Sequence, residues 1–197
     1  MTRVLRTVGL LPGACLAAAL LCVSSNAAAQ EPRPSEVKAA FLAKFAKFTD
    51  WPAEVLPVDA PITFCVMGDD EVAGAIERLD RTRAGQGREA KVLRLRVDIL
   101  SRREDATVRS CHMLYVSGLD SKLWPVLLNA IEGAPVFSVS DSEGFAERGG
   151  VAALYVELKK MRFAINVDTI RRSGLHLSAS VLSLARIVKD DPNRPRR

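Results

Sequence analysis

Apolar residues along the chain form short runs that are separated by polar segments containing glycine or proline. Three runs have the length and composition of strands buried on both faces. They are ITFCVM at 62–67, CHMLYVS at 111–117 and PVFSV at 135–139. The run KVLRLRV at 91–97 instead alternates apolar and basic residues, which predicts a half-exposed strand near the edge of a sheet.

Other segments carry apolar residues at helical spacing. The clearest is SEVKAAFLAKFAKFTDW at 35–51, which Ser35 caps and Pro52 ends. Its apolar stripe predicts the buried face and comprises Val37, Ala40, Phe41, Phe45 and Phe48. Further helices are expected at 71–79, 122–131, 168–174 and 178–188, the third capped by Asp168 and the fourth by Ser178.

The order of these elements defines the expected fold class. Two apolar runs at 151–158 and 161–166, separated only by Lys159-Lys160, predict a β-hairpin without the usual Asn-Gly turn. Strands that alternate with helices favour an α/β protein, because parallel strands need crossover connections. We therefore expect a single three-layer α/β/α domain at 30–190, with a mostly parallel sheet of about five to six strands and a C-terminal β-hairpin.

The first 29 residues have the three parts of a secretory signal peptide. A basic region at Arg3 and Arg6 precedes the apolar segment 8–23, and Ala27-Ala28-Ala29 offers a cleavage site. We expect export with cleavage after Ala29. A lipoprotein signal is the alternative, although neither early cysteine follows a good lipobox.

The remaining chain has no apolar run of the ~18 residues that a membrane helix needs, so no integral membrane segment is expected. The polar, proline-containing segment 191–197 is predicted to be a disordered basic tail. Of the net charge of +5, much lies in 78–109, which holds ten basic and five acidic residues and no aromatic one. Without aromatic stacking platforms a nucleic-acid surface is disfavoured. The stretch is either a solvated face or a docking face for an acidic partner or anionic lipid headgroups.

Cys65 and Cys111 are the cysteines that remain after signal cleavage. In an oxidising compartment, two cysteines most simply form one disulfide, which predicts a Cys65–Cys111 bridge. A free or metal-binding thiol is the alternative. With only His112 and His176 in the chain and no C-x-x-C pair, a zinc site is poorly supplied, and no metal ligands are predicted.

The sequence contains no catalytic motif of a common class. The turn GDDEVAG at 68–74 lacks the glycine spacing of a phosphate loop, and Asp69 and Asp70 are better explained as helix caps. No G-x-S-x-G elbow occurs, and neither His112 nor His176 has an identifiable catalytic partner. We expect no catalytic residues, no cofactor and no enzymatic activity.

The segment SVSDSEGFAERGG at 138–150 connects two predicted strands and combines three acids with three glycines. The acids argue against a phosphate cradle. The glycines fit left-handed or closely packed backbone, and Phe145 is expected to anchor the loop in the core. Because the loop follows a strand end, a small binding crevice with Asp141 and Arg148 at its rim remains a hypothesis.

Five stretches occur in a characteristic order and spacing between about 36 and 188: EVKAAFLAKFAKFTDWP, FCVMGDD, CHMLYVS, SVSDSEGFAERGG and MRFAINVDTIRRSGLHLSASVLSLARIV. Together they resemble the YfiR family of periplasmic proteins. The resemblance implies a regulator that represses an inner-membrane diguanylate cyclase, YfiN-like, by contacting its periplasmic sensor domain. Repression lowers cyclic-di-GMP and affects biofilm formation. An outer-membrane OmpA-like lipoprotein, YfiB-like, relieves the repression.

The resemblance also implies a homodimer and disulfide-linked redox behaviour. Cys65 and Cys111 match one cysteine pair of the family, whereas the second pair found in some members is missing here. Candidate partner surfaces are the basic stretch and the exposed part of the aromatic stripe, represented by Phe41, Phe45, Arg94 and Arg96. The alternative function is a periplasmic small-molecule binding module of a sensory or transport system without a cyclase partner.

Overall fold

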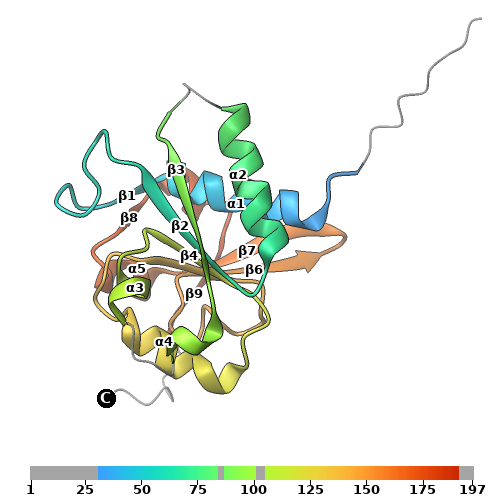
Figure 1. Cartoon of the computed structure of the whole chain (residues 1–197). Coiled ribbons are helices and arrows are strands. Elements are labelled where there is room, and N and C mark those ends of the chain that lie inside the picture. The colour runs from blue at the N-terminus through green and yellow to red at the C-terminus, as the bar shows by residue number, and fades with distance from the viewer. Residues whose placement is uncertain (1–30, 84–86, 101–104, 191–197) are drawn as a thin grey trace, which may run out of the picture. The chain divides into compact units, whose positions relative to one another are not determined.

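Within residues 31–83, 87–100 and 105–190, which the computed structural model describes, a seven-stranded mixed sheet forms the centre of the fold (Figure 1). Its strand order is β3-β2-β4-β5-β6-β7-β9, and a separate pair joins β1 to β8. The strands are β1 (Thr49–Asp50), β2 (Ile62–Met67), β3 (Ala90–Leu95), β4 (Met113–Val116), β5 (Phe137–Ser140), β6 (Ala152–Glu157), β7 (Lys160–Asn166), β8 (His176–Leu177) and β9 (Arg186–Val188).

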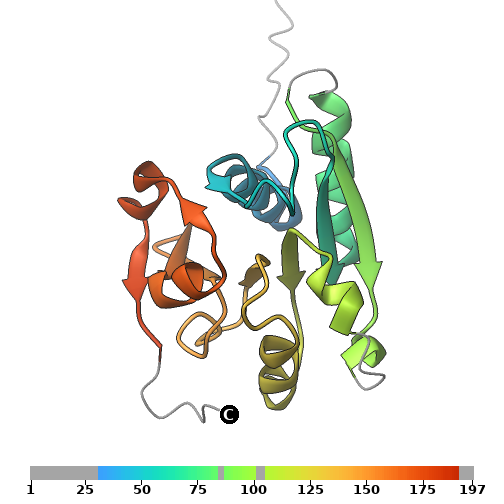
Figure 2. The same ribbon diagram turned by 90° about the vertical axis from the view of Figure 1, so that its left-hand side faces the viewer.

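Helices connect most of the parallel strands. The α-helices are α1 (Pro34–Lys47), α2 (Asp70–Thr82), α3 (Asp105–Arg109), α4 (Trp124–Ala130), α5 (Val167–Arg172) and α6 (Ala179–Leu182), with short 3-10 turns η1 (Val97–Leu100) and η2 (Ser121–Leu123). Figures 1 and 2 both show α2 lying along β2 and β3. Strands β3, β2, β4, β5 and β6 are mutually parallel, and β7 returns antiparallel to β6 as a hairpin.

Alternate strand residues point to opposite faces of the sheet and form two cores. On one face, Phe64 and Tyr115 belong to a core that includes residues of α1, α2 and α5. On the other, Cys65 and Leu114 belong to a core that includes residues of α3 and α4. Helices therefore cover both faces, which confirms the three-layer α/β/α architecture and the mostly parallel sheet.

The first helix differs from its predicted form at both ends and in its buried face. Arg33 rather than Ser35 is the N-cap, and the helix ends at Lys47, four residues before Trp51. Ser35 is buried instead, in a face that also contains Ala39, Leu42 and Phe45. Ser35 and Ala39 have small side chains, which allow this face of the helix to pack closely. Phe41 lies on the flank of that face and is only partly buried at the boundary of the core.

The C-terminal region also corrects the sequence prediction. The helix expected at 178–188 ends at Leu182, and residues 186–188 form β9, which pairs in parallel with β7. Ser178 is the predicted N-cap, accepting from the amide of Ser180. A short helix is only marginally stable by itself, whereas pairing with β7 satisfies the backbone hydrogen-bonding groups of 186–188. The tertiary contact therefore prevails over the helical pattern. It also raises the number of strands above the expected five to six.

Two local details of this region were predicted at the wrong residue. The N-cap of α5 is Asn166, whose side chain accepts from the amides of Asp168 and Thr169, so Asp168 is not the cap. The hairpin turn is Leu158-Lys159 rather than Lys159-Lys160, because Lys160 already pairs with Glu157. The predicted signal peptide and basic tail lie outside the described residues, and the described chain from Pro32 onward belongs to one compact unit.

Candidate functional site

Three neighbouring parallel strands end at the same edge of the sheet and place polar residues there. β2 runs into Gly68 and Asp69, β4 into Ser117, and β5 into Asp141. In open α/β sheets this edge binds ligands where successive connections leave in opposite directions. Such a point lies between β2 and β4, because β3 is on the other side of β2. The edge formed by the carboxyl ends of β2, β4 and β5 is therefore the expected position of a functional site.

Lys38 of α1 reaches this edge and joins two of its carboxylates. Its Nζ atom lies 2.7 Å from Oδ2 of Asp141 and 3.3 Å from Oδ2 of Asp69. Ser117 donates from Oγ to the same Asp141 oxygen over 3.1 Å. Asp69 also caps α2, as predicted, by accepting from the amide of Val72. The four half-buried residues Lys38, Asp69, Ser117 and Asp141 are called the carboxyl-edge cluster below.

Burial and pairing fix the protonation states in and beside the cluster. Burial lowers the pKa of Lys38, but the hydrogen bond to Asp141 and the attraction of its carboxylate outweigh this effect and raise the pKa above its ordinary value. Burial raises the pKa of Asp141, and Lys38 outweighs it so that the pKa falls below its ordinary value. The buried hydroxyl of Tyr115 has no hydrogen-bond partner of ordinary geometry, and burial raises its pKa.

These shifts determine what chemistry the cluster supports. At neutral pH, Lys38 is charged, Asp141 is ionised and Tyr115 is neutral. General acid–base catalysis works best with a group whose pKa lies near the operating pH, and none of these three meets that condition. One ammonium between two carboxylates also leaves net negative charge, which disfavours phosphate. The cluster is a set of ion pairs that links α1 to the residues that follow β2 and β5.

The loop at 138–150 closes around Phe145. This side chain is buried and packs edge-on against Trp124 of α4, with ring centroids 5.5 Å apart. Gly150 is needed beside it, because a Cβ there would lie 2.1 Å from the ring. Arg148 stacks on Trp124 with its guanidinium carbon 5.2 Å from the ring centroid. The predicted anchoring by Phe145 and the close packing at Gly150 are confirmed.

The structure does not bring Asp141 and Arg148 together at the rim of one crevice. Asp141 pairs with Lys38 of α1, whereas Arg148 stacks on Trp124 of α4. These two helices pack against opposite faces of the sheet. The sequence prediction placed both residues on one loop correctly, but it had no means of pairing Asp141 with a lysine 103 positions earlier.

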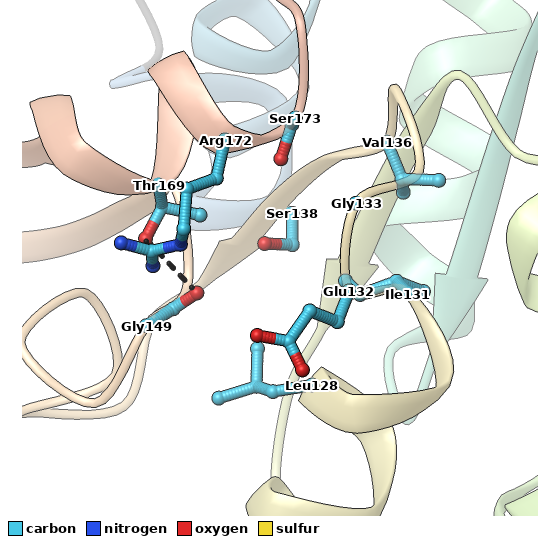
Figure 3. Close-up of a pocket in the computed structure, with 10 residues that line it drawn as sticks. All are labelled: Leu128, Ile131, Glu132, Gly133, Val136, Ser138, Gly149, Thr169, Arg172 and Ser173. Atoms are coloured by element: carbon cyan, nitrogen blue, oxygen red, sulfur yellow. Dashed lines mark hydrogen bonds between the residues drawn. The ribbon is translucent and has the colours of Figure 1, made fainter. Parts of the chain in front are cut away.

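A hollow of about 320 Å³, part of it open to solvent, borders the same loop at different residues (Figure 3). Ser138 and Gly149 line it together with the end of α4 and with α5. Figure 3 shows the Thr169 hydroxyl beside Gly149, to whose carbonyl oxygen it donates over 3.3 Å. The guanidinium of Arg172 lies 2.6 Å from a carboxylate oxygen of Asp190 and bonds Thr169. The cation at this border is therefore already engaged.

Cys65 and Cys111 form the predicted disulfide, which links β2 to the residues that lead into β4. The next residue, His112, is packed between two segments. Its Nδ1 accepts from the amide of Thr63 over 2.9 Å, and its Nε2 lies 3.2 Å from the carbonyl oxygen of Val55. Burial lowers the pKa of His112, which favours the neutral ring. The histidine therefore has a structural role at this place.

The four candidate partner residues differ in what they offer. Phe45 is 1% exposed and stacked in the aromatic core, so its assignment to a partner surface is wrong. Phe41 is half-buried. Arg94 and Arg96 lie on and just after the edge strand β3, as predicted. Arg94 pairs with Glu77 at 2.7 Å, whereas the side chain of Arg96 is 88% exposed. The sequence could not separate Phe41 from Phe45, because helical periodicity does not reveal which residues of an apolar stripe the rest of the protein covers.

Within residues 31–83, 87–100 and 105–190, no three His, Cys, Asp or Glu side chains gather as potential ligands of a metal ion. None of the helices in these ranges has the length and apolar character needed to cross a membrane.

Solved structures define the class of the fold. The ABC domain from Streptococcus pneumoniae, determined in complex with L-Trp, is 12% identical with a TM-score of 0.52 and matches 79% of this chain and 60% of its own. A conserved domain protein from Vibrio cholerae O1 biovar El Tor strain N16961 is 15% identical with a TM-score of 0.52, over 80% of this chain and 60% of its own. The chain thus spans 60% of the length of both. The likeness shows the α/β fold.

A family model identifies the chain more closely. The YfiR/HmsC-like family matches residues 35–186, so the protein belongs to this family. The match confirms the resemblance that the five sequence stretches indicated. Membership supports a periplasmic regulator of cyclic-di-GMP signalling in general, with a regulatory rather than catalytic role.

Proposed function

We propose that this protein binds and represses the periplasmic sensor domain of an inner-membrane diguanylate cyclase, and thereby lowers cyclic-di-GMP signalling. The observation that carries the proposal is the family match over residues 35–186. In the carboxyl-edge cluster, the pKa of Lys38 is raised and that of Asp141 is lowered, both away from the neutral range, which agrees with a regulatory rather than a catalytic role.

Repression by binding is a shift in the conformational equilibrium of the cyclase. The repressor must bind the inactive sensor conformation more tightly than the active one. Turning a receptor from almost fully active to almost fully inactive takes roughly 5.5 kcal/mol of differential affinity. A stable interface of standard size buries about 800 Å² on each partner, so the contact must extend over several elements.

The edge at β3 is the surface we assign to this contact. Arg94 is already paired with Glu77 and Asp70. Arg96, which is 88% exposed and lies 3.5 Å from Asp98, and the exposed Lys91 present positive charge at this edge. Such charge speeds association with an acidic sensor surface and makes it sensitive to salt. Phe41 supplies a half-buried apolar contact, whereas Phe45 is excluded by its burial.

Other parts of the proposal go beyond this contact. The N-terminal signal pattern supports cleavage after Ala29. The family resemblance supports assembly as a homodimer, and release of the cyclase when an outer-membrane OmpA-like lipoprotein sequesters this protein. The Cys65–Cys111 bridge has either a purely structural or a redox-regulated role in this scheme.

The test combines genetics with capture from membranes. Deleting the gene is expected to raise cyclic-di-GMP, and tagged protein is expected to retain a diguanylate cyclase from detergent-solubilised inner membranes. Arg96→Glu should weaken capture several-fold, because it reverses an exposed interface charge. Lys122→Glu, an exposed charge reversal before α4, is the matched control and should capture normally. Unchanged cyclic-di-GMP in the deletion strain, with no cyclase retained, would refute the proposal.

The hollow beside α5 is where a small molecule would bind under the alternative function, a periplasmic small-molecule binding module without a cyclase partner. Its 320 Å³ includes space open to solvent, so a ligand there would be small and partly exposed. A metabolite screen by thermal shift tests this, since a ligand of the folded state raises Tm. Amino acids belong in the screen because the Streptococcus structure contains L-Trp. A true ligand should lose its effect in Glu132→Arg at the hollow but keep it in the control Glu143→Arg.

A further inference from the structure

The β6–β7 hairpin extends beyond the strands on either side of it. β5 pairs with β6 only as far as Ala153, and β9 pairs with β7 only from Ala164 onward. In these pairings the intervening residues 154–163 contact no strand other than their partner in the hairpin. Figure 1 shows this hairpin, in orange, running out to the margin of the ribbon. The sheet therefore ends in a projecting two-stranded tip.

Large apolar side chains are exposed at this tip. Leu158 is 88% exposed and Val156 is 69% exposed, although neither has polar atoms that would favour contact with water. The whole segment 156–160 is exposed. Two large exposed apolar residues within three positions on a projecting element are a candidate interaction site, whereas scattered single ones are ordinary.

The turn holds its residues in a conformation that they rarely adopt. Leu158 has φ +49° and Lys159 has φ +60°, the pattern of a type I′ turn. Asn-Gly is strongly preferred there, because other side chains crowd the backbone when φ is positive. Packing does not explain the choice, since Leu158 is almost fully exposed. A leucine kept in a strained and exposed position indicates a role outside the fold.

The charges around the apolar tip are mainly positive. Lys159 and Lys160 are exposed and follow Leu158 directly. Arg162, two residues further along β7, is also exposed. Glu157 supplies the single carboxylate of 156–162, and Arg162 lies 3.8 Å from it. The two lysines therefore carry a local positive charge beside the apolar side chains.

We propose that this hairpin tip docks on the surface of an anionic lipid bilayer, with Leu158 and Val156 entering the headgroup region and Lys159 and Lys160 meeting lipid phosphates. Apolar insertion combined with charge attraction is how peripheral elements bind such surfaces. A protein partner fits less well, because two apolar side chains on a narrow tip offer far less than the roughly 800 Å² of a standard interface. The inference does not depend on the proposed cyclase partner.

Co-sedimentation with large vesicles tests this proposal on the purified protein. We expect binding to vesicles of phosphatidylglycerol mixed with phosphatidylcholine, little binding to phosphatidylcholine alone, and loss of binding as salt is raised. Absence of binding to the anionic vesicles, or equal binding to both kinds, would overturn the proposal.

Leu158→Asn separates a docking role from a structural one. Asparagine tolerates positive φ, so the variant should have an equal or higher Tm, yet its binding to anionic vesicles should fall several-fold. Val58→Asn is the matched control, since Val58 is 83% exposed in the loop between β1 and β2. It should bind like the wild type. Full vesicle binding by Leu158→Asn, or an equal loss in Val58→Asn, contradicts the assignment of the tip.

The charge contribution is measured with Lys159→Glu and Lys160→Glu. Each lysine near an anionic surface contributes enough to change binding about fivefold, so the double variant should lose binding almost completely. Lys122→Glu changes charge by the same amount per site elsewhere on the surface and should bind nearly normally. If it loses as much binding as a single tip variant, overall charge rather than the tip is responsible and the proposal fails.

Discussion

At the scale of single residues, Lys38 connects parts of the chain that no local interaction would bring together. Its ammonium group donates hydrogen bonds to Asp69 and Asp141, which are 31 and 103 positions away along the chain. Without it, two half-buried carboxylates would face each other with no cation between them. Leaving a buried charge without its partner costs much more than the intact pair contributes.

We therefore expect Lys38→Met to lower the free energy of unfolding by about 2 kcal/mol, because the cluster is only half-buried and fully buried pairs cost more. Urea titration followed by circular dichroism measures this. Lys44→Met is the matched control, since Lys44 is exposed on the same helix. It should change stability by less than about 0.5 kcal/mol. Equal stability of the two variants would show that the cluster contributes no net energy.

Only part of the cluster was predictable from the sequence. Asp141 was singled out because it follows a strand end, and Asp69 because it precedes a helix. Lys38 had no such signal, since a lysine on the flank of an amphipathic helix is ordinarily solvated. Its pairing depends on the angle at which α1 crosses the sheet, and that angle is set by tertiary packing.

At the scale of elements, the disulfide holds the central strands together. Cys65 in β2 and Cys111, which leads into β4, are 46 residues apart, and the closed segment contains α2, β3 and α3. The bridge restricts the unfolded chain more than the folded one, so its main effect is on the free energy of unfolding.

We expect the double variant Cys65→Ser, Cys111→Ser to fold with its free energy of unfolding reduced by about 3–4 kcal/mol. Urea unfolding of the oxidised wild type, the reduced wild type and the variant measures this. Reductant should lower the stability of the wild type to a similar extent and leave the variant unchanged. Labelling of both cysteines by a thiol reagent in the oxidised native protein would contradict the bridge.

Elements were predictable where the local pattern and the tertiary contacts agree. The apolar runs of β2, β4 and β5 are buried on both faces, so composition alone identified them. Residues 186–188 show the opposite case. Their helical spacing continued that of α6, but pairing with β7 made them a strand. Non-local pairing of this kind leaves no periodic signal in a three-residue strand.

At the scale of the whole molecule, buried and paired ionisable groups make stability depend on pH. His112 has its pKa lowered by burial, with the charge of Arg88 acting in the same direction and the Val55 carbonyl against it. Asp141 also has a lowered pKa, and Lys38 has a raised one. A lowered pKa contributes stability above the unfolded value, whereas a raised pKa contributes stability below it.

Stability should therefore form a plateau between the unfolded pKa values of histidine, 6.5, and lysine, 10.5. As pH falls below 6.5, the free energy of unfolding drops while protons bind the unfolded His112 first, and Asp141 adds a further loss below its unfolded value of 3.8. As pH rises above 10.5, the contribution of Lys38 disappears as its folded pKa is approached.

Urea unfolding measured across this pH range checks the profile. Two variants show which side chain causes the acidic decline and which causes the alkaline decline. His112→Asn keeps an acceptor for the amide of Thr63 but cannot titrate, so it should remove most of the first acidic decline. Lys38→Met should flatten the alkaline decline and leave the histidine step in place. If both variants retained the full wild-type profile, other groups would have to account for it, and the linkage of these two side chains to folding would be wrong.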